Sequence, residues 1–311
     1  MIRLKHIIAP LCLFCSLAAQ AQDPASIGFQ TDARSAGMGG AGIATDANAL
    51  SLYRNTAAIS FSESKVAASY SYVSLFNDAN LHTVGGYYRL NERHAFTAGV
   101  RYFAPDKVYN MVGGSDGTAY TSVQPYDLLI DLGYTQKVND VLGLSANLRY
   151  VYSKLNEVPG FKTGKTLAMD LGMYFRKDAY SAALTVNNLG KLIDYGVEKY
   201  RMPASINLGG AYRYSPAADH QITGSVEGKY NFMPGDYCFF SGGAGAEYMF
   251  RKMVAVRGGY YLTSENKSTG NYGSVGCGVY VGPVTVDFAY LLTENTSIMK
   301  DVWYLTVGVK F

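Results

Sequence analysis

The clearest repeating pattern in the chain is Leu142-Gly143-Leu144-Ser145-Ala146-Asn147-Leu148-Arg149-Tyr150-Val151-Tyr152. Leucine, alanine and tyrosine occupy every second position, and the positions between them are small, polar or charged except at Val151. A period of two residues is typical of a β-strand and not of a helix. The segment therefore predicts a strand with one apolar face and one polar face.

The same alternation recurs from about Lys65 to Phe311 at the end of the chain. It predicts fourteen strands of ten to fourteen residues, which are 65–76, 81–90, 94–104, 126–137, 141–154, 166–176, 178–190, 204–214, 219–231, 241–250, 253–263, 272–282, 284–293 and 301–311. An even number of strands of this length is typical of a barrel whose tilted strands cross a bilayer. We therefore expect an all-β fold, a 14-stranded antiparallel transmembrane β-barrel of the outer-membrane type.

The predicted connections alternate between short and long. Their lengths were not used to identify the strands, so they are an independent observation. The short set is 91–93, 138–140, 177, 215–218, 251–252 and 283. The opposite set is 77–80, 105–125, 155–165, 191–203, 232–240, 264–271 and 294–300, and all of these but the first are long. Short periplasmic turns and long external loops are typical of outer-membrane barrels. We therefore expect Asn91 in the periplasm, and Gly114 and Lys267 at the cell surface.

The composition excludes other classes of protein. Among 311 residues, 16% are charged and there are 27 tyrosines and 34 glycines, whereas soluble domains carry about 25% charged residues and disordered chains are poor in aromatics. After the first twenty positions, no apolar run is long enough for a membrane-spanning helix. A soluble β-sandwich also alternates, but it does not explain the excess of aromatics, the unequal connections or the terminal Phe311, which resembles a barrel-insertion signal.

The two faces of the strands have different predicted surroundings. The residues expected to face lipid are Leu144, Leu148, Val286 and Val307. A lysine near the midplane there costs about 2–4 kcal/mol. A lysine at Ser145 or Thr306 is expected to be tolerated, because these residues are predicted to face a wet interior.

Residues 1–21 are predicted to be a secretory signal peptide. Arg3 and Lys5 precede an apolar core, and Ala19-Gln20-Ala21 is a small-x-small cleavage site. Removing Arg3 and Lys5 lowers the net charge from +3 to +1, so no basic footprint for nucleic acid remains and no nucleic-acid partner is expected. We expect the mature chain to begin at Gln22 and to be exported to the cell outer membrane of a Gram-negative bacterium.

Residues 22–64 differ from the rest, and we expect them to form a plug inside or beneath a barrel that spans 65–311. The segment contains Gly37-Met38-Gly39-Gly40-Ala41-Gly42, and residues 46–55 are expected to form a short helix capped by Asp46. The glycines match the dinucleotide pattern G-x-G-x-x-G, but the parallel β-α-β unit that this site needs is missing from the pattern. Close backbone packing, which glycine allows, is the preferred interpretation.

This segment also carries a family resemblance. Asp32-Ala33-Arg34-Ser35-Ala36-Gly37-Met38-Gly39-Gly40-Ala41-Gly42-Ile43-Ala44, followed by Asp46 and Tyr53-Arg54-Asn55-Thr56-Ala57-Ala58, resembles the N-terminal signature of the PorV/PorQ family, distant relatives of the FadL long-chain fatty-acid transporters. Both groups are fourteen-stranded outer-membrane barrels, so the resemblance implies the same architecture. The typical Asn-Pro-Ala-Gly of the family is here Asn55-Thr56-Ala57-Ala58. The candidate plug residues are Asp32, Arg34, Gly37, Gly39, Gly40, Gly42, Asp46 and Asn55.

The charged residues of the predicted inner face have mixed signs. They are Arg89, Arg101, Asp131, Arg149, Asp170, Arg176, Arg213, Glu227, Lys229, Glu247, Arg257, Asp287 and Lys310. Because unpaired buried charge is costly, we expect a paired network that braces the wall and the plug rather than a selectivity filter. His82, His94 and His220 lack metal-ligand spacing, and Gly113-Gly114-Ser115-Asp116-Gly117 lacks the strand-to-helix elbow of a serine hydrolase. No catalytic residue, metal or cofactor is expected, and a lipid-modifying enzyme is the least favoured function.

Two functions remain open. The resemblance to PorV implies a non-catalytic barrel that binds secretion-system proteins or exported cargo in type IX secretion and cell-surface attachment. The resemblance to FadL implies a channel for long-chain fatty acids or other hydrophobic compounds. Apolar and aromatic residues in 105–125 and 191–203 could serve either function, and the candidate extracellular contacts are Tyr109, Met111, Tyr120 and Tyr195. In both cases the barrel is expected to be surrounded by outer-membrane lipid.

Overall fold

The computed structural model describes residues 27–75, 78–105, 108–111, 120–154, 162–196, 199–232, 238–264, 270–294, 297 and 299–311, with the backbone alone in 108–111 and 120–123. The predicted signal peptide 1–21 lies outside the described residues, as do Gly114 and Lys267. Among the residues that are described, no helix is long and apolar enough to cross a membrane.

The wall is a closed antiparallel barrel of fourteen strands, as the alternation predicts. Its strands are β1 (Val66–Ser74), β2 (Asn80–Arg89), β3 (His94–Ala104), β6 (Tyr126–Lys137), β7 (Leu142–Lys154), β8 (Gly164–Lys177), β9 (Tyr180–Gly190), β12 (Ala204–Ala217), β13 (His220–Phe232), β14 (Phe239–Phe250), β15 (Val254–Thr263), β16 (Tyr272–Val281), β17 (Val284–Leu292) and β18 (Trp303–Lys310). Each strand pairs with its neighbour in the chain, and β1 pairs with β18 to close the ring. Every strand overlaps its predicted range, so the all-β barrel is confirmed.

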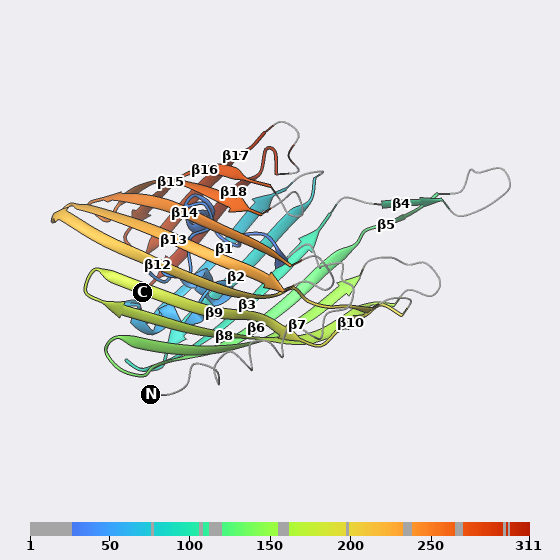
Figure 1. Cartoon of the computed structure of the whole chain (residues 1–311), viewed down its shortest axis with the longest axis horizontal. Helices are drawn as coiled ribbons and strands as arrows, with labels where there is room; N and C mark the ends of the chain where they lie inside the picture. The colour runs from blue at the N-terminus through green and yellow to red at the C-terminus, as the bar shows by residue number, and fades with distance from the viewer. Residues whose placement is uncertain are drawn as a thin grey trace.

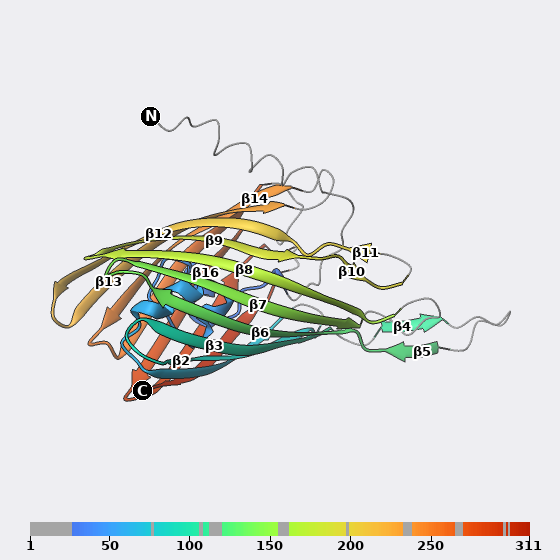
Figure 2. The ribbon, with the colours of Figure 1, turned by 90° about the horizontal axis from the view of Figure 1, so that it is seen from below.

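The two ends of the barrel differ as predicted. At the turn end, the connections are 90–93, 138–141, 178–179, 218–219, 251–253 and 282–283. At the loop end, the connection 105–125 carries the hairpin of β4 (Val108–Met111) and β5 (Tyr120–Val123), and 191–203 carries that of β10 (Ile193–Asp194) and β11 (Lys199–Tyr200). Figures 1 and 2 show the β4–β5 hairpin extending well beyond the rim of the barrel.

The outer face is apolar and carries aromatic side chains at two levels. A loop-end belt runs across six neighbouring strands from β18 to β7, with successive ring centroids 5.2–6.3 Å apart, and consists of Trp303, Tyr72, His82, Tyr102, Tyr126 and Tyr152. Near the turn end, exposed aromatic residues include Tyr88, Phe96, Tyr134, Tyr180, Tyr212, Tyr248 and Phe250. Aromatic girdles of this kind mark the two membrane interfaces of outer-membrane barrels. Leu144, Leu148 and Val307 are exposed on this outer face, as predicted.

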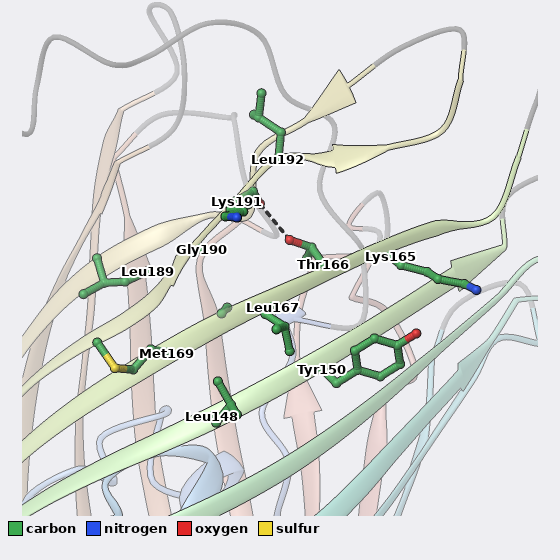
Figure 3. A pocket seen from close by; sticks show the side chains of 11 residues that line it. Leu148, Tyr150, Lys165, Thr166, Leu167, Met169, Leu189, Gly190, Lys191 and Leu192 are labelled. Carbon is green, nitrogen blue, oxygen red and sulfur yellow. Dashed lines mark hydrogen bonds between the residues drawn. The ribbon is translucent and has the colours of Figure 1, made fainter.

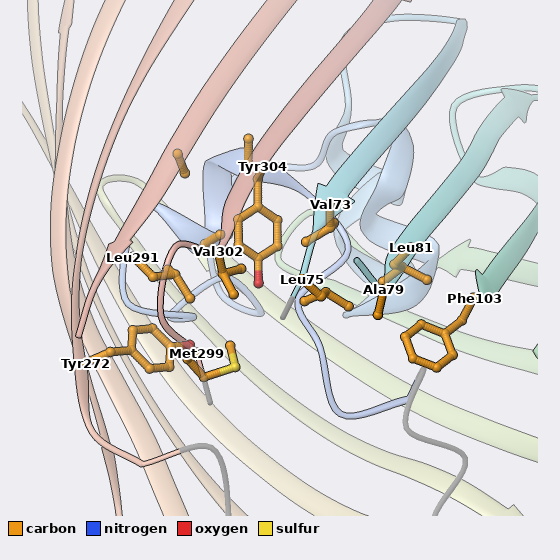
Figure 4. Close-up of a cluster of buried hydrophobic side chains, with 13 residues drawn as sticks. Val73, Leu75, Ala79, Leu81, Phe103, Tyr272, Leu291, Met299, Val302 and Tyr304 are labelled. Carbon is orange, nitrogen blue, oxygen red and sulfur yellow. The ribbon is translucent and has the colours of Figure 1, made fainter. Parts of the chain in front are cut away.

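The lumen is filled by the segment that precedes β1. It contains the short helix α2 (Ala33–Ala36) and the 3-10 helices η3 (Ala49–Tyr53) and η4 (Thr56–Phe61), which Figure 2 shows inside the ring of strands. These helices pack on residues of the wall. The inner core therefore consists of several clusters of buried apolar side chains between plug and wall. Figure 4 shows the largest of these described clusters, in which Tyr304, Leu291 and Leu81 from the wall meet Met299 and Val302 from the connection before β18.

Candidate functional site

Asp32 begins the plug and holds its first helix. Its carboxylate accepts hydrogen bonds from the Ser35 backbone amide at 3.1 Å and from the Ser35 hydroxyl at 2.6 Å, so it is the N-cap of α2. The guanidinium of Arg54 lies 3.1 Å from the same carboxylate. Asp32 is fully buried, and a buried carboxylate is stable only with partners of this kind. The residue therefore ties the start of the plug to its later part.

Arg34 joins the plug to the wall through a chain of buried charges. Its guanidinium donates to both carboxylate oxygens of Glu247 on β14, at 2.8 and 3.0 Å. Arg257 on β15 donates to the same carboxylate at 2.6 Å and lies 2.8 Å from Asp287 on β17. The predicted network that braces wall and plug is therefore confirmed, with Glu247 shared between two arginines.

The glycine-rich motif packs directly against the wall backbone. Gly39 and Gly40 have φ of +63° and +79°, a conformation that favours glycine. A Cβ on Gly39 would lie 2.6 Å from the backbone of Tyr260, and a Cβ on Gly243 would overlap the Gly39 carbonyl oxygen. Earlier in the same motif, a Cβ on Gly37 would lie within 3.3 Å of two backbone atoms. Close backbone packing, rather than nucleotide binding, accounts for these glycines.

The motif ends on a carboxylate from the wall. The backbone amides of Gly42 and Ile43 donate to one oxygen of Glu227 on β13, at 3.0 and 3.1 Å. Paired amide donors stabilise an anion at one oxygen. Glu227 thus fixes the position at which the chain leaves the glycine-rich turn.

Asp46 has a different role from the predicted one. The residue that caps η3 is Asn48, whose side chain accepts from the Leu50 amide at 3.0 Å and whose backbone amide donates to the Ser51 hydroxyl at 2.9 Å. A short helix therefore lies within 46–55 as predicted, but the prediction that Asp46 caps it is wrong. The Asp46 carboxylate instead pairs with Arg213 on β12 of the wall, because it lies two residues before the cap and points to the wall.

Asn55 caps η4 and also reaches the wall. Its side-chain oxygen accepts from the Ala57 amide at 3.1 Å. Its side-chain nitrogen donates to the carbonyl oxygens of Ile43 and of Met173 on β8, each at 3.2 Å. A single amide group thus holds two parts of the plug and one strand, although the Pro and Gly of the family motif are replaced.

A second charge network lies in the wall opposite the first. Arg149 on β7 is 2.7 Å from Asp131 on β6 and 2.7 Å from Asp170 on β8. Arg101 on β3 lies 3.7 Å from Asp131, and its guanidinium carbon is 4.8 Å from the ring centroid of Tyr53 in the plug. All of these charged groups are buried, so this half of the lumen is also braced.

The space that remains between the plug and this network is small and polar. A cavity of about 80 Å³ is lined by Arg54, Arg149, Asp170 and Glu227 among other residues. Pockets for small-molecule ligands usually measure about 300–1,000 Å³ and are mostly apolar. Among the described residues, no group of three His, Cys, Asp or Glu side chains is placed to hold a metal ion.

Thr306 shows a plug contact that the sequence pattern did not predict. Its hydroxyl accepts from the Ala33 amide at 3.0 Å and lies 2.8 Å from the Ser71 hydroxyl. Thr306 is buried, so the expectation that a lysine is tolerated there is wrong. The period of two places the residue on the inner face, but it does not say that a helix covers that face.

The connection 191–203 folds inward over the loop end. Ile193, Tyr195 and Met202 are buried against Leu129 and other inner-face residues. The Tyr195 hydroxyl donates to the Ser153 hydroxyl at 2.8 Å. Tyr195 is therefore not exposed as expected for an extracellular contact, because the loop returns into the mouth of the barrel.

The outer part of this loop carries an exposed ion pair. The Lys162 ammonium lies 3.2 Å from the Asp194 carboxylate. A hydrogen bond from the Gly196 amide, followed by the Lys162 side chain, lowers the pKa of Asp194. Of the other candidate contacts, Tyr109 and Met111 lie on β4 and Tyr120 lies on β5, in the hairpin that extends beyond the rim.

A sequence profile of the family described as Type IX secretion system protein PorV matches residues 25–236, which is more than half of the chain. The chain belongs to the PorV family. The residues that match the PorV profile comprise the plug and the wall from β1 to β13. No curated protein matches the sequence.

Several solved structures are similar to this PorV-family barrel in fold. The toluene transporter TbuX of Ralstonia pickettii has a TM-score of 0.62 at 16% identity, with 92% of this chain and 99% of that chain covered. The P. putida toluene transporter TodX has a TM-score of 0.65 at 12% identity, with 91% and 99% covered. A Pseudomonas aeruginosa FadL homologue has a TM-score of 0.56 at 13% identity, with 90% and 98% covered. The PorV-family chain therefore has a FadL-like outer-membrane barrel fold.

Proposed function

We propose that the protein is a non-catalytic barrel of the outer membrane that binds secretion-system proteins or exported cargo during type IX secretion. The observation that carries this proposal is that the lumen holds a plug tied to the wall on both sides, by Arg34–Glu247 and by Asn55 with Met173. These contacts fix the plug within the centre of the barrel. A cavity of about 80 Å³ beside the plug is polar.

The loop end supports the proposal from outside. The β4–β5 hairpin extends beyond the rim, where it is accessible to a protein partner (Figure 1). Its sequence contains Tyr109, Met111 and Tyr120, and aromatic residues supply much of the binding energy at protein interfaces. Membership of the PorV family agrees with this role.

The test is co-purification of secreted proteins with the full chain after gentle extraction. Substituting Tyr109, Met111 and Tyr120 with Ser should abolish recovery of the partner, and the barrel should keep its heat-modifiable mobility on gels. A matched variant with Ser at Tyr180 and Tyr212, which lie at the turn end on the outer face, should retain the partner. Recovery of the same partner by the hairpin variant would contradict the proposal.

A second candidate is a channel for long-chain fatty acids or other hydrophobic compounds. It is favoured by the fold shared with proteins described as toluene transporters. In that case, purified protein in liposomes should speed the uptake of an apolar solute such as toluene or oleate. Weakening the plug by Glu247→Gln should raise that uptake further. Uptake equal to that of protein-free liposomes by both the unmodified protein and the Glu247→Gln variant would leave partner binding as the remaining candidate function.

A further inference from the structure

A groove crosses the outer face of β7, β8 and β9 near the loop end (Figure 3). Its volume is about 660 Å³. On the side toward the turn end it is lined by the apolar side chains Leu148, Leu167, Met169 and Leu189. This size falls within the usual range of ligand sites, about 300–1,000 Å³, and the lining suits a hydrocarbon chain.

The groove is built into the backbone. The pairing of β8 with β9 shifts register between Met169 and Leu171, and on the opposite strand Asn188 has φ of +59°. The Asn188 amide donates to the buried Asp170 carboxylate at 2.6 Å, which holds the bulge from inside the barrel. Such a bulge bends the strand and aims its side chains differently. The depression is therefore fixed by inner-face contacts.

Two lysines flank the loop end of the groove. Lys165 pairs in register with Tyr152, a member of the loop-end belt, and its ammonium lies 5.6 Å from that ring centroid. The Lys191 carbonyl accepts from the Thr166 hydroxyl at 3.0 Å, and Figure 3 shows the two lysines on either side of Thr166. Both lysines are exposed, and the lining of the groove contains no acidic residue. The cations thus lie at the depth where lipid headgroups meet the aromatic belt.

We propose that this groove is a binding site for a membrane lipid of the leaflet at the loop end whose phosphate headgroup carries a net negative charge. An acyl chain would lie along Leu148, Leu167 and Met169, and the phosphate would sit between Lys165 and Lys191. Charge complementarity favours this occupant, because lysine ammonium groups bind phosphate as point charges and no carboxylate of the groove opposes them. The site is separate from the lumen and from the β4–β5 hairpin, so it does not depend on the proposed function.

The test uses native mass spectrometry of the purified full chain titrated with phosphatidylglycerol or with phosphatidylcholine of the same acyl chains. The unmodified protein should retain phosphatidylglycerol more tightly. The variant with Lys165→Gln and Lys191→Gln should bind it roughly tenfold more weakly, since two favourable charge contacts are lost. The matched control, Lys177→Gln with Lys252→Gln, removes two exposed charges at the turn end and should behave like the unmodified protein.

A second variant tests the apolar part without removing charge. Met169→Trp should obstruct the groove and weaken phosphatidylglycerol binding, while heat-modifiable gel mobility reports that the barrel has folded. Equal binding of the two lipids by the unmodified protein would overturn the proposal. So would unchanged phosphatidylglycerol binding by the double lysine variant, or displacement of phosphatidylglycerol by equimolar oleate, which would identify the site as one for free fatty acid.

Discussion

The two faces of β7 have the same spacing of side chains but opposite surroundings. On the outer face, Leu144 and Leu148 are exposed to the membrane, whereas on the inner face Asn147 and Arg149 are buried. Arg149 is held by carboxylates of both neighbouring strands. In this barrel, apolar residues are therefore the exposed ones, and charged residues form much of the core. The barrel is therefore stable only if its outer face carries no charge in the membrane and the charges on its inner face are paired.

The largest effect is expected from breaking a buried pair on the inner face. Glu247→Leu removes the carboxylate shared by Arg34 and Arg257, so the partly buried Arg34 loses this partner and the buried Arg257 keeps Asp287 as its remaining carboxylate partner. Breaking a buried pair in this way costs about 3–5 kcal/mol. The midpoint of urea unfolding in detergent, followed by tryptophan fluorescence of Trp303, should fall accordingly.

The control for this change is Glu247→Gln, which keeps the shape of the side chain and can still accept a hydrogen bond. It should lose less stability than Glu247→Leu. If the leucine variant were as stable as the unmodified protein, the inner charges would not form the core described above.

A somewhat smaller effect is expected from adding a charge to the outer face. Leu148→Lys places an ammonium group among lipid tails and should cost about 2–4 kcal/mol if the residue lies near the midplane. The matched change Leu148→Phe keeps the face apolar and should be nearly neutral. Folding into lipid vesicles, measured by gel mobility, would show the difference, and equal folding yields would place this residue outside the hydrocarbon.

A third change tests a neutral contact of the plug. Thr306→Val preserves the volume but removes the hydroxyl that accepts from the Ala33 amide. A buried donor left unsatisfied costs about 1–3 kcal/mol. Hydrogen exchange of residues 33–36 should become faster, while exchange in β18 should stay slow. Unchanged protection at 33–36 would mean that Thr306 does not anchor α2.

The smallest effect is expected at the rim of the barrel, where side chains face neither the membrane nor the packed interior. The hydrogen bond from the Gly196 amide, and then the one from Lys162, lower the pKa of Asp194 in the folded protein. These contacts therefore stabilise the hairpin at pH values above the unfolded pKa, about 3.9. This contribution is lost as the pH falls through the folded pKa. Hydrogen exchange of 193–196 and 199–200, corrected for its intrinsic pH dependence, should therefore be constant from pH 8 to pH 5. In Asp194→Asn, protection should already be slightly reduced at pH 7.

The alternation of residues was sufficient to predict the wall. Each of the fourteen strands and the contrast between turns and loops follow from periods of two and from turn residues. The inward charges were also predictable, because an Arg or Glu among apolar neighbours on a strand must face away from lipid. Glu247 is an example, because it is the one charged residue in the run Gly243-Ala244-Gly245-Ala246-Glu247.

The partners of these charges were not predictable from the pattern. The link between Arg34 and Glu247 joins positions that are far apart in the chain, and periodicity does not specify which plug residue reaches which strand. For the same reason, Asp46 reads as a helix cap in isolation, whereas in the fold it pairs with Arg213. From the pattern alone, Thr306 is a solvent-facing residue of the inner face. In the fold it is buried, because α2 packs on it.

The hydrogen bond between Ala33 and Thr306 has a consequence for the order of assembly. It joins the first described helix to the last strand, and β1 likewise finds its second neighbour only in β18. Contacts that close so long a loop form late and slowly. The contact of α2 with Thr306 therefore cannot form until the end of the chain has reached its place, and until then the edges of β1 and β18 stay open. That interval, before the ring closes, is the stage at which this protein is most prone to aggregate.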